Sequence, residues 1–425
     1  MTPHQGQDRF LTPAYLSPLT AYLGCMALGA LRHRNFRLFV GGQFVSLIGT
    51  WMQTVALGWV VLELTNSPFQ VGLVSTLGAL PVLLFTLYGG VVADRANKHR
   101  MVLLLQTGML IEALALAILA HTGHLTIHWI QGLALLAGLF SAFEIPARQA
   151  FVGEMVGKDD LFTAVAINST VFNGTRVIGP ALAGILLAAA GAAVCFYVNA
   201  ASYLAVLAGL ILMRLPPRPE RPPSSGAADW KALWEGVRYV FGSPTQRTLV
   251  VVTTSFSIFG FAFITMLPVF ARDVLGTGSA GYGAMMSAVG IGAASGAIGA
   301  AIWGRSLDRE RWVLPSALGF ALTLVAAGFA PNLPVALVLF GLVGFAWVLM
   351  AVFTNTILQT TSPDALRGRV MGFYSFMVVG LAPIGSFQMG WVAEHYGARV
   401  AYMLGGLLCI LVAVTAWSRA TRTVR

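Results

Sequence analysis

The chain has 425 residues, of which 57% are hydrophobic and only 10% are charged. A soluble domain carries about 25% charged residues, so this chain has more apolar surface than a soluble core can bury, and lipid must cover the remainder. The formal net charge of +10 does not indicate nucleic-acid binding, because most basic residues lie in short segments between long apolar runs, as in the cytoplasmic loops of membrane proteins.

The apolar runs are continuous and long enough for an α-helix to cross a bilayer, which takes about 20 residues. The short alternating strands of a membrane β-barrel are not seen, so the sequence predicts an all-α membrane protein. An even number of spans puts both termini on one side, and the basic residues near both ends identify that side as the cytoplasm. We expect twelve transmembrane helices, near residues 37–63, 68–93, 101–121, 129–154, 160–190, 192–213, 246–271, 280–303, 312–330, 334–361, 368–393 and 398–418.

A polar linker separates the sixth span from the seventh. It begins with a proline-rich stretch that cannot be helical, and residues Trp230 to Phe241 then carry apolar side chains at helical spacing, which predicts a helix on the membrane surface. The expected domains are a cytoplasmic arm (1–36, which could lie on the membrane as a helix), an N-terminal six-helix bundle (37–213), a cytoplasmic linker (214–245), a C-terminal six-helix bundle (246–418) and a cytoplasmic tail (419–425).

A short motif of the form Gly-x-x-x-Asp-Arg occurs once in each half of the chain, after the second span and after the eighth. Its recurrence at the same place in each half indicates an internal duplication, with the two bundles related by a pseudo-two-fold axis along the membrane normal. The two copies are formed by Gly90, Asp94 and Arg95 and by Gly304, Asp308 and Arg309.

Four charged residues fall inside predicted spans and away from the span ends, where each needs a reason because a charge in the bilayer is costly. Glu112 lies midway along the third span, Glu144 and Arg148 lie one turn apart on the fourth, and Arg176 lies deep in the fifth. One interpretation is a protonatable carboxylate with basic neighbours, with Glu144 as the first candidate for proton coupling and Glu112 as the next. The alternative is a structural ion pair that locks helices together.

Polar residues also follow one face of several spans. This pattern predicts either a water-filled central cavity or hydrogen bonds between helices, which are worth only about 0.6 kcal/mol each. Two such faces in the first half favour the cavity, and the candidates in the second half are weaker. The candidates are Gln43, Ser46, Thr50, Gln53 and Thr54 on the first span, Ser169 and Asn173 on the fifth, and Asn355, Gln359 and Tyr374 in the second half.

No signature of an enzyme, a cofactor or a metal site stands out. The chain has no phosphate-binding loop, so ATP is not the evident energy source, and its three cysteines lie in apolar runs without disulfide or metal spacing. His121, His124 and His128 share an external loop, and we interpret them as residues of a solvated loop and not as metal ligands.

The loop after the second span resembles the signature loop of the major facilitator superfamily. Asn97 stands where glycine is usual, and asparagine tolerates the left-handed turn that glycine makes there. The segment from Gly174 to Gly184, with Gly179 and Pro180, resembles the Gly-Pro motif of proton-driven exporters. Three further stretches, 31–37, 146–151 and 366–372, resemble the branch that holds enterobactin and macrolide exporters. One departure is that 130–139 lacks the arginine that many drug/proton antiporters carry early in the fourth span.

The resemblance implies a gating role for Asp94. In this superfamily the loop acid meets the cytoplasmic end of the eleventh span, here near Arg367 and Arg369. A carboxylate at a helix N-terminus gains about 0.3–1 kcal/mol from the helix dipole, so such a contact would hold the outward-facing state and break when the cavity opens inward. The alternative is a topological anchor that only stops the loop from crossing the membrane.

The sequence and the resemblance together favour a secondary active transporter of the bacterial inner membrane. We expect a monomer that exports a small amphipathic molecule, a drug or a siderophore, by proton-coupled alternating access, with the substrate, protons and lipid as its partners and no nucleic acid. Uptake or flipping of a nutrient or lysolipid by the same fold is one alternative. A membrane scaffold or sensor that transports nothing is another, although it would not need buried charges or polar faces.

Overall fold

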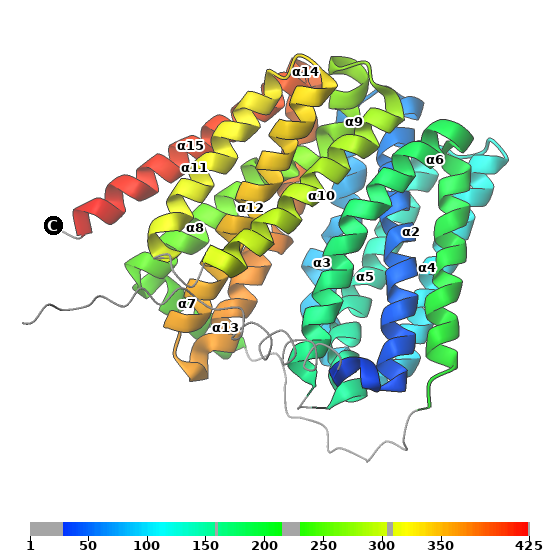
Figure 1. The fold of residues 1–425 in the computed structure, drawn as a ribbon, viewed down its shortest axis with the longest axis horizontal. Helices are drawn as coiled ribbons and strands as arrows, with labels where there is room; N and C mark the ends of the chain where they lie inside the picture. Colours follow the sequence, from blue (N-terminus) through cyan, green and yellow to red (C-terminus); the bar gives the residue numbers. More distant parts are fainter. Residues whose placement is uncertain (1–28, 158–159, 215–229, 304–308, 424–425) are drawn as a thin grey trace, which may run out of the picture.

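The computed structural model describes residues 29–157, 160–214, 230–303 and 309–423, and throughout these ranges the regular secondary structure is helical (Figure 1). Eleven of the described helical segments are long and apolar enough to cross a membrane. The longest, α6 (Leu161–Ile211), spans 51 residues and is divided at Gly191, whose φ of 80° and ψ of 175° interrupt the helix. Its two parts, 161–190 and 192–211, bring the spanning segments to twelve and confirm the predicted all-α fold.

The N-terminal half consists of long helices joined by short connections. Asn66, at a left-handed φ of 50°, ends the first of them, and the Ser67 side chain accepts a hydrogen bond from Gln70 N at the start of the second. Asn97 caps the third through Arg100 N at a φ of −73°, so it is a helix N-cap and not the left-handed turn residue that the motif predicts. The helices are α2 (Arg34–Thr65), α3 (Pro68–Arg95), α4 (Lys98–His121), α5 (Ile127–Val156) and α6, preceded by the short 3₁₀-helix η2 (Ala30–Arg32).

Two spans of the C-terminal half are interrupted near proline. Pro268 and Pro383 each stand in the first turn of a helical piece that follows a 3₁₀ or π segment, because proline lacks the N–H of a helix interior and clashes with the preceding turn. The seventh span comprises α8 (Pro244–Phe259), η3 (Phe261–Met266), α9 (Leu267–Val269) and η4 (Phe270–Val274), and the eleventh comprises α13 (Asp364–Ser375), η5 (Phe376–Gly380) and α14 (Ala382–Tyr396). The other helices are α10 (Gly278–Trp303), α11 (Arg309–Gly328), α12 (Leu333–Thr361) and α15 (Ala398–Thr423).

The linker helix predicted over 230–241 is present as α7 (Trp230–Gly242). It packs on the corner between α12 and α13, where Tyr239 Oη donates to Thr361 O at 3.2 Å and Glu235 forms an ion pair with Arg369. Trp234 on the same helix is 71% exposed. One face of α7 is therefore bound to the C-terminal half, and an aromatic side chain is left free on another.

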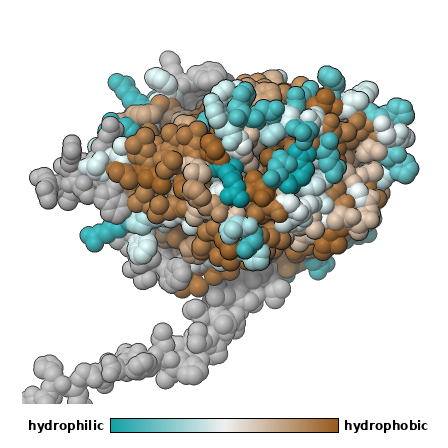
Figure 2. Space-filling model, turned by 90° about the horizontal axis from the view of Figure 1, so that it is seen from above, coloured by the Kyte–Doolittle hydropathy of each residue, from teal (hydrophilic) through white to brown (hydrophobic). Residues whose placement is uncertain are grey.

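Large apolar side chains cover the outside of the bundle. Leu104 on α4, Ile185 on α6 and Ile302 on α10 are each at least 65% exposed. A patch of this extent is not left to water in a soluble protein. Figure 2, which views the molecule from the top of Figure 1, shows hydrophilic residues on this end face beside large hydrophobic areas. The surface therefore agrees with a multi-pass membrane protein.

The two halves meet along two helix pairs, α3 with α14 and α6 with α10. In each pair a glycine faces a glycine. A Cβ atom built on Gly283 would lie 2.5 Å from Gly184 Cα, and one on Gly390 would lie 3.0 Å from Gly72 Cα. Helix backbones approach this closely only where the side chain is absent, so these glycines permit the contact between the halves.

We call the end of the bundle where α3 is joined to α4 the basic end, and the end where α2 is joined to α3 the opposite end. Hydrogen bonds between the halves extend from the opposite end to the middle of the helices: Thr76 Oγ1 donates to Pro383 O at 3.1 Å, and Ser287 Oγ donates to Val177 O at 3.1 Å. Toward the basic end, the helices of the two halves spread apart (Figure 1).

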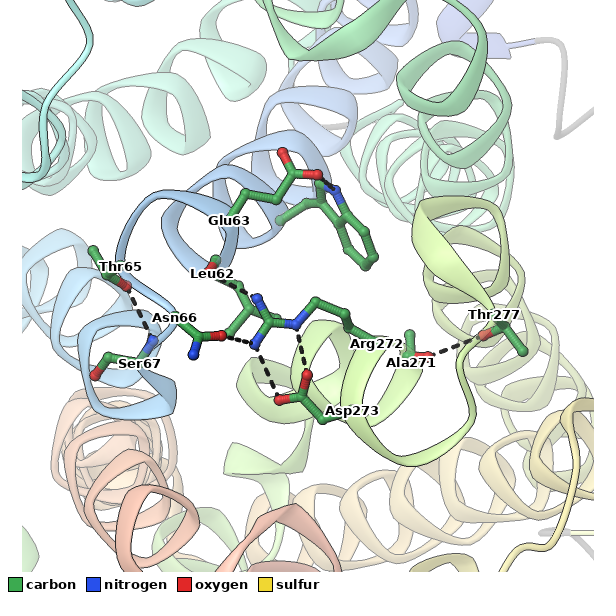
Figure 3. A network of polar contacts seen from close by, with 10 residues as sticks. Leu62, Glu63, Thr65, Asn66, Ser67, Ala271, Arg272, Asp273 and Thr277 are labelled. Atoms are coloured by element: carbon green, nitrogen blue, oxygen red, sulfur yellow. Dashed lines mark hydrogen bonds and ion pairs between the residues drawn. The ribbon is translucent and has the colours of Figure 1, made fainter.

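The opposite end is closed by an arginine of the C-terminal half (Figure 3). The guanidinium of Arg272 donates to Leu62 O at 3.0 Å and to Asn66 Oδ1 at 2.6 Å, and it pairs with Asp273 beside it at 2.6 Å. Leu62 O belongs to the last turn of α2, where the carbonyl groups are incompletely paired and the helix dipole is negative. A cation of one half thus satisfies a helix C-terminus of the other.

A carboxylate of the C-terminal half makes the complementary contact at the start of α3. Glu394 Oε2 accepts from Ser67 Oγ at 2.8 Å and from Phe69 N at 3.0 Å. A carboxylate at a helix N-terminus is stabilised by the free N–H groups and by the positive end of the dipole. The α2–α3 connection is therefore held from both sides by opposite charges of the other half.

The Gly184–Gly283 crossing predicts a conformational effect of a single methyl group. In Gly283→Ala the new Cβ meets backbone, and such overpacking costs about 1–3 kcal/mol, so we expect the form with a closed opposite end to lose population. Distances between spin labels at the exposed residues Gln149 and Thr360, in a cysteine-free background, should become shorter at the basic end. Gly174→Ala is the matched control, because a Cβ there meets nothing within 4 Å. Equal distance distributions in both variants would contradict the prediction.

The charges at the α2–α3 connection predict an effect of the same sign. Arg272→Gln or Glu394→Gln removes a charge from a helix terminus, and each should weaken closure of the opposite end by about 1 kcal/mol, or about fivefold in the population ratio. Labels at the exposed residues His124 and Tyr396 should then report longer distances. Arg399→Gln is the control, since Arg399 donates to Gly328 O within its own half. If the control shifts the distances as much as Arg272→Gln does, the contact does not act as a latch.

Candidate functional site

Glu112 is the centre of a polar network inside the N-terminal half. Its side chain on α4 is only 3% exposed, and Gln53 Nε2 on α2 donates to its two carboxylate oxygens at 3.1 and 3.3 Å. Asn199 Nδ2 on α6 donates to Gln53 Oε1 at 2.7 Å, and Ser202 Oγ donates to Asn199 Oδ1 at 3.3 Å. A row of donors from α6 through α2 therefore ends at a carboxylate that has no cation among the partners described here.

Glu144 has a different environment, although it is also buried. One of its oxygens accepts from Arg148 Nε at 2.9 Å, one turn later on α5 as the spacing predicts, and from Gln106 Nε2 on α4 at 3.0 Å. The Arg148 side chain is 14% exposed. Glu144 is therefore the member of an ion pair within α5 and is linked to α4 through Gln106, whereas the hydrogen bonds found for Glu112 come from the amide of Gln53.

The polar face predicted on the first span is partly covered by a neighbouring helix. Gln43 and Ser46 are buried, and Ser46 O accepts from Ser202 Oγ of α6 at 3.5 Å. The reason is local, since a Cβ on Gly42 or Gly49 would collide with the second part of α6, which therefore covers this face. The structure thus places these two residues between helices, while Thr50 stays exposed and Gln53 stays partly exposed.

The other cavity candidates form bonds mainly within their own helices. Asn173 Nδ2 donates to Ser169 O on α6 at 2.9 Å, and Gln359 Nε2 donates to Asn355 Oδ1 on α12 at 2.7 Å. Ser169 and Gln359 are exposed, whereas Tyr374 is buried at 6% exposure. These residues are not brought together into one cluster.

Arg176 lies where the two halves meet. Its guanidinium carbon is 5.9 Å from the ring centre of Trp51 on α2 and 6.0 Å from that of Phe261 on η3, distances at which a cation is attracted to an aromatic ring. Arg176 and Glu144 come from adjacent spans, but they have different neighbours in the structure. Arg176 contacts rings of both halves, and Glu144 pairs with Arg148.

The Gly-Pro motif seats Arg176 against these partners. A Cβ on Gly179 would lie 2.5 Å from Trp51 Cβ, so the glycine lets α6 approach α2 beside the arginine. Pro180 O lies close to Gly283, and Gly184 crosses Gly283 one turn further along α6. The motif therefore acts through helix packing at the boundary between the halves.

The residues predicted for gating lie at the open basic end. Asp94 and Arg95 are exposed and Gly90 has open space around its Cα. Arg367 Nε donates to Gln359 O at 2.9 Å, and Arg369 pairs with Glu235 of α7, so these two arginines make other contacts in this conformation. Of the second motif copy, Asp308 lies outside the described residues and Arg309 begins α11.

Sequence reasoning missed Arg272, Glu394, Gln106 and Asn199. Arg272 carries a signal that could have revealed it, because it is one of the few basic residues outside the basic segments. Asn199 and Gln106 carry only a weak signal, since a single amide in an apolar span is common, and their importance depends on which helix faces them. Within the described ranges, no group of three His, Cys, Asp or Glu side chains is placed to hold a metal ion.

Comparisons with known proteins agree with this architecture. A family described as "Transmembrane secretion effector" matches residues 25–424. The multidrug efflux pump Tap of Mycolicibacterium fortuitum is 28% identical over 384 residues, which cover 87% of this chain and 91% of Tap. The enterobactin exporter EntS of Shigella flexneri is 28% identical over 390 residues, which cover 90% of this chain and 92% of EntS.

Among solved structures, a bacterial homologue of the human lysosomal transporter Spinster, in an inward-facing and unoccupied conformation, superposes with a TM-score of 0.72. It is 14% identical, and the match covers 90% of this chain and 96% of that one, so the likeness concerns the fold. The chain therefore belongs to the transmembrane secretion effector family of the major facilitator superfamily, and it is a membrane transporter and not an enzyme.

Proposed function

We propose that this chain exports a small amphipathic molecule, a drug or a siderophore, in exchange for protons, by alternating access through the bacterial inner membrane. The observation that carries the proposal is the arrangement around α2. On one side of this helix Gln53 binds the buried carboxylate of Glu112, and two residues earlier Trp51 contacts Arg176 at the boundary between the halves. One helix thus touches both a protonatable group and the surface along which the halves meet. The relatives named as an efflux pump and an exporter support the direction of transport.

The orientation that fits the basic residues puts the basic end and both termini in the cytoplasm. With that orientation, the conformation described above is the inward-open one. Arg272 and Glu394 then close the periplasmic side. Asp94 lies on the cytoplasmic side and would contact the N-terminus of α13 only when that side closes. The two sets of contacts would be exchanged during each transport cycle.

Glu112 is better suited than Glu144 to carry the coupled proton. A buried carboxylate without a cation is costly to keep charged, so its charge state can respond to a proton supplied from one side. Glu144 already has Arg148 as its counter-charge at 2.9 Å, and protonating it would leave a buried cation uncompensated. This assignment reverses the order of candidates that the sequence suggests, because the sequence does not reveal that Gln53 faces Glu112.

Protonation of Glu112 would change the hydrogen bonds of α2. A protonated carboxyl group is a hydrogen-bond donor. Gln53 can accept a hydrogen bond from it only by turning its carbonyl oxygen toward Glu112. This turn would take the oxygen away from Asn199 Nδ2, which it binds at 2.7 Å. The bond between α2 and α6 would therefore depend on the charge of Glu112, and α2 also contacts Arg176 through Trp51. The contacts from Glu112 through Gln53 and α2 to Trp51 would thus link protonation of Glu112 to the boundary between the halves.

Isosteric variants of the two carboxylates should separate coupling from stability. In proteoliposomes with an imposed pH gradient, Glu112→Gln should abolish uphill accumulation of a transported drug or siderophore, while exchange without a gradient and the melting temperature are kept. Glu144→Gln breaks a buried ion pair and should lower the stability in detergent by about 3–5 kcal/mol. Uphill transport by Glu112→Gln with the wild-type pH dependence would refute the proton role of Glu112.

The proposed gating role of Asp94 predicts a shift in the other direction. If Asp94 meets the N-terminus of α13 only in the cytoplasm-closed state, Asp94→Asn should destabilise that state by about 1 kcal/mol or less. Labels at Gln149 and Thr360 should then report longer distances, with slower transport and unchanged expression. Asp160→Asn is the control, because Asp160 binds His33 within the N-terminal half at 2.8 Å. Full transport by Asp94→Asn would mean that the loop is only an anchor.

A further inference from the structure

We propose that the transported molecule is an aromatic anion, and that Arg176 binds its negative group while rings from both halves contact its aromatic part. This inference rests on the proposed export function and names the class of substrate that the central site would take. It is carried by the charge balance around Arg176 and by the rings that surround it.

The guanidinium of Arg176 has no carboxylate partner among the described residues. Within the described ranges, the carboxylates buried in the spans are Glu112 and Glu144, and both are occupied: Glu144 binds Arg148 and Gln106, and Glu112 binds Gln53. The contacts found for the Arg176 guanidinium are the two aromatic rings. Arg176 is partly exposed, and an arginine inside a span becomes costly when water is excluded from it unless an anion compensates its charge. Its planar fork of N–H groups matches a carboxylate or another oxyanion.

Aromatic side chains stand on both sides of the arginine. In the N-terminal half, the ring of Trp51 lies beside that of Phe172, with ring centres 6.2 Å apart. In the C-terminal half, Phe261 stacks on Trp347, with ring centres 4.7 Å apart and an angle of 26° between the planes. A flat aromatic molecule can pack against such surfaces, and one that contacts both would bridge the two halves.

The rings are accessible as well as close. Trp51 and Phe261 are partly exposed and Phe172 is 41% exposed, whereas Trp347 is buried behind Phe261. Phe261 opens the 3₁₀ segment η3 directly after Gly260 ends α8, so it lies at an interruption of the seventh span. This arrangement differs from a closed core, in which the rings around a structural arginine would be covered.

The same charge disfavours other classes of substrate. A cationic aromatic molecule at this site would meet an uncompensated guanidinium and be repelled, and a neutral one would leave the charge as it is. An aliphatic anion would satisfy the arginine but not the rings. An aromatic anion is the class that satisfies both.

Two dyes with the same xanthene ring system and opposite charge provide the test. Binding of fluorescein, an anion at pH 8, and of rhodamine 123, a cation, is measured by fluorescence anisotropy on the purified full-length protein. Wild type should bind fluorescein at least tenfold more tightly than rhodamine 123. Arg176→Gln should weaken fluorescein binding at least tenfold and leave rhodamine 123 binding unchanged or tighter. The fluorescein affinity of Arg176→Lys should lie between those of wild type and Arg176→Gln. The fluorescein affinity of Arg399→Gln should equal that of wild type.

The comparison of fluorescein and rhodamine 123 binding by wild type does not depend on the folding of a variant. Equal binding of the two dyes by wild type would overturn the inference, as would unchanged fluorescein binding in Arg176→Gln. In either case Arg176 is a structural link between the rings of the two halves. Trp51→Leu should weaken both dyes, and loss of fluorescein binding alone in that variant would count against a role of the ring.

Transport of the same dyes in proteoliposomes separates this inference from the proposed function. If wild type moves rhodamine 123 in exchange for protons but neither binds nor moves fluorescein, export stands and the aromatic-anion inference is refuted. If fluorescein binds in an Arg176-dependent way but neither dye moves under a pH gradient, the site stands and proton-coupled export is refuted. Movement of fluorescein that requires Arg176 supports both.

Discussion

The arrangement of the two halves depends on how the ends of α2 and α3 are satisfied. A helix end leaves backbone groups without partners inside the helix, and at the edge of a bilayer these groups must find water or protein. Here the C-terminal half supplies a cation for the end of α2 through Arg272 and an anion for the start of α3 through Glu394. Each charge is opposite in sign to the end of the helix dipole that it contacts. The contact is therefore specific for one relative position of the halves.

The buried carboxylates and a cluster of buried aromatic rings lie in different halves. Both buried carboxylates, with the amides that bind them, belong to the N-terminal half, whereas the C-terminal half contributes a cluster of aromatic rings around Phe263, Phe340 and Tyr402. The N-terminal half thus contains groups whose charge can change, and the C-terminal half contains a buried aromatic core. Arg176 lies at the boundary between the two halves, near Trp51 and Phe261. In the export cycle that we propose, a change of charge in the N-terminal half would alter its contacts with the C-terminal half.

Much of the fold could be predicted from the sequence, because a run of about 20 apolar residues has few structural solutions in a membrane. The Glu144–Arg148 pair was also predictable, since residues four apart share one helix face. The partner of Glu112 was not, because it depends on how α2 is rotated against α4. A polar stripe shows that a helix faces something polar, but not whether water or a neighbouring helix supplies it. For Gln43 and Ser46 the glycines of α2 decide this by admitting α6. The carboxylate-to-helix contact expected of Asp94 has a counterpart at the other end of the molecule, made by Glu394.

The two glycine crossings have a mechanical consequence for the whole molecule. Gly184 with Gly283 and Gly72 with Gly390 are backbone-to-backbone contacts on two different helix pairs, so the line through them is where the halves approach most closely. The crossings lie toward one end of the helices, and most of the length of each helix extends beyond them. In the transport cycle that we propose, a small rotation of the halves about this line would therefore produce a large displacement at the basic end.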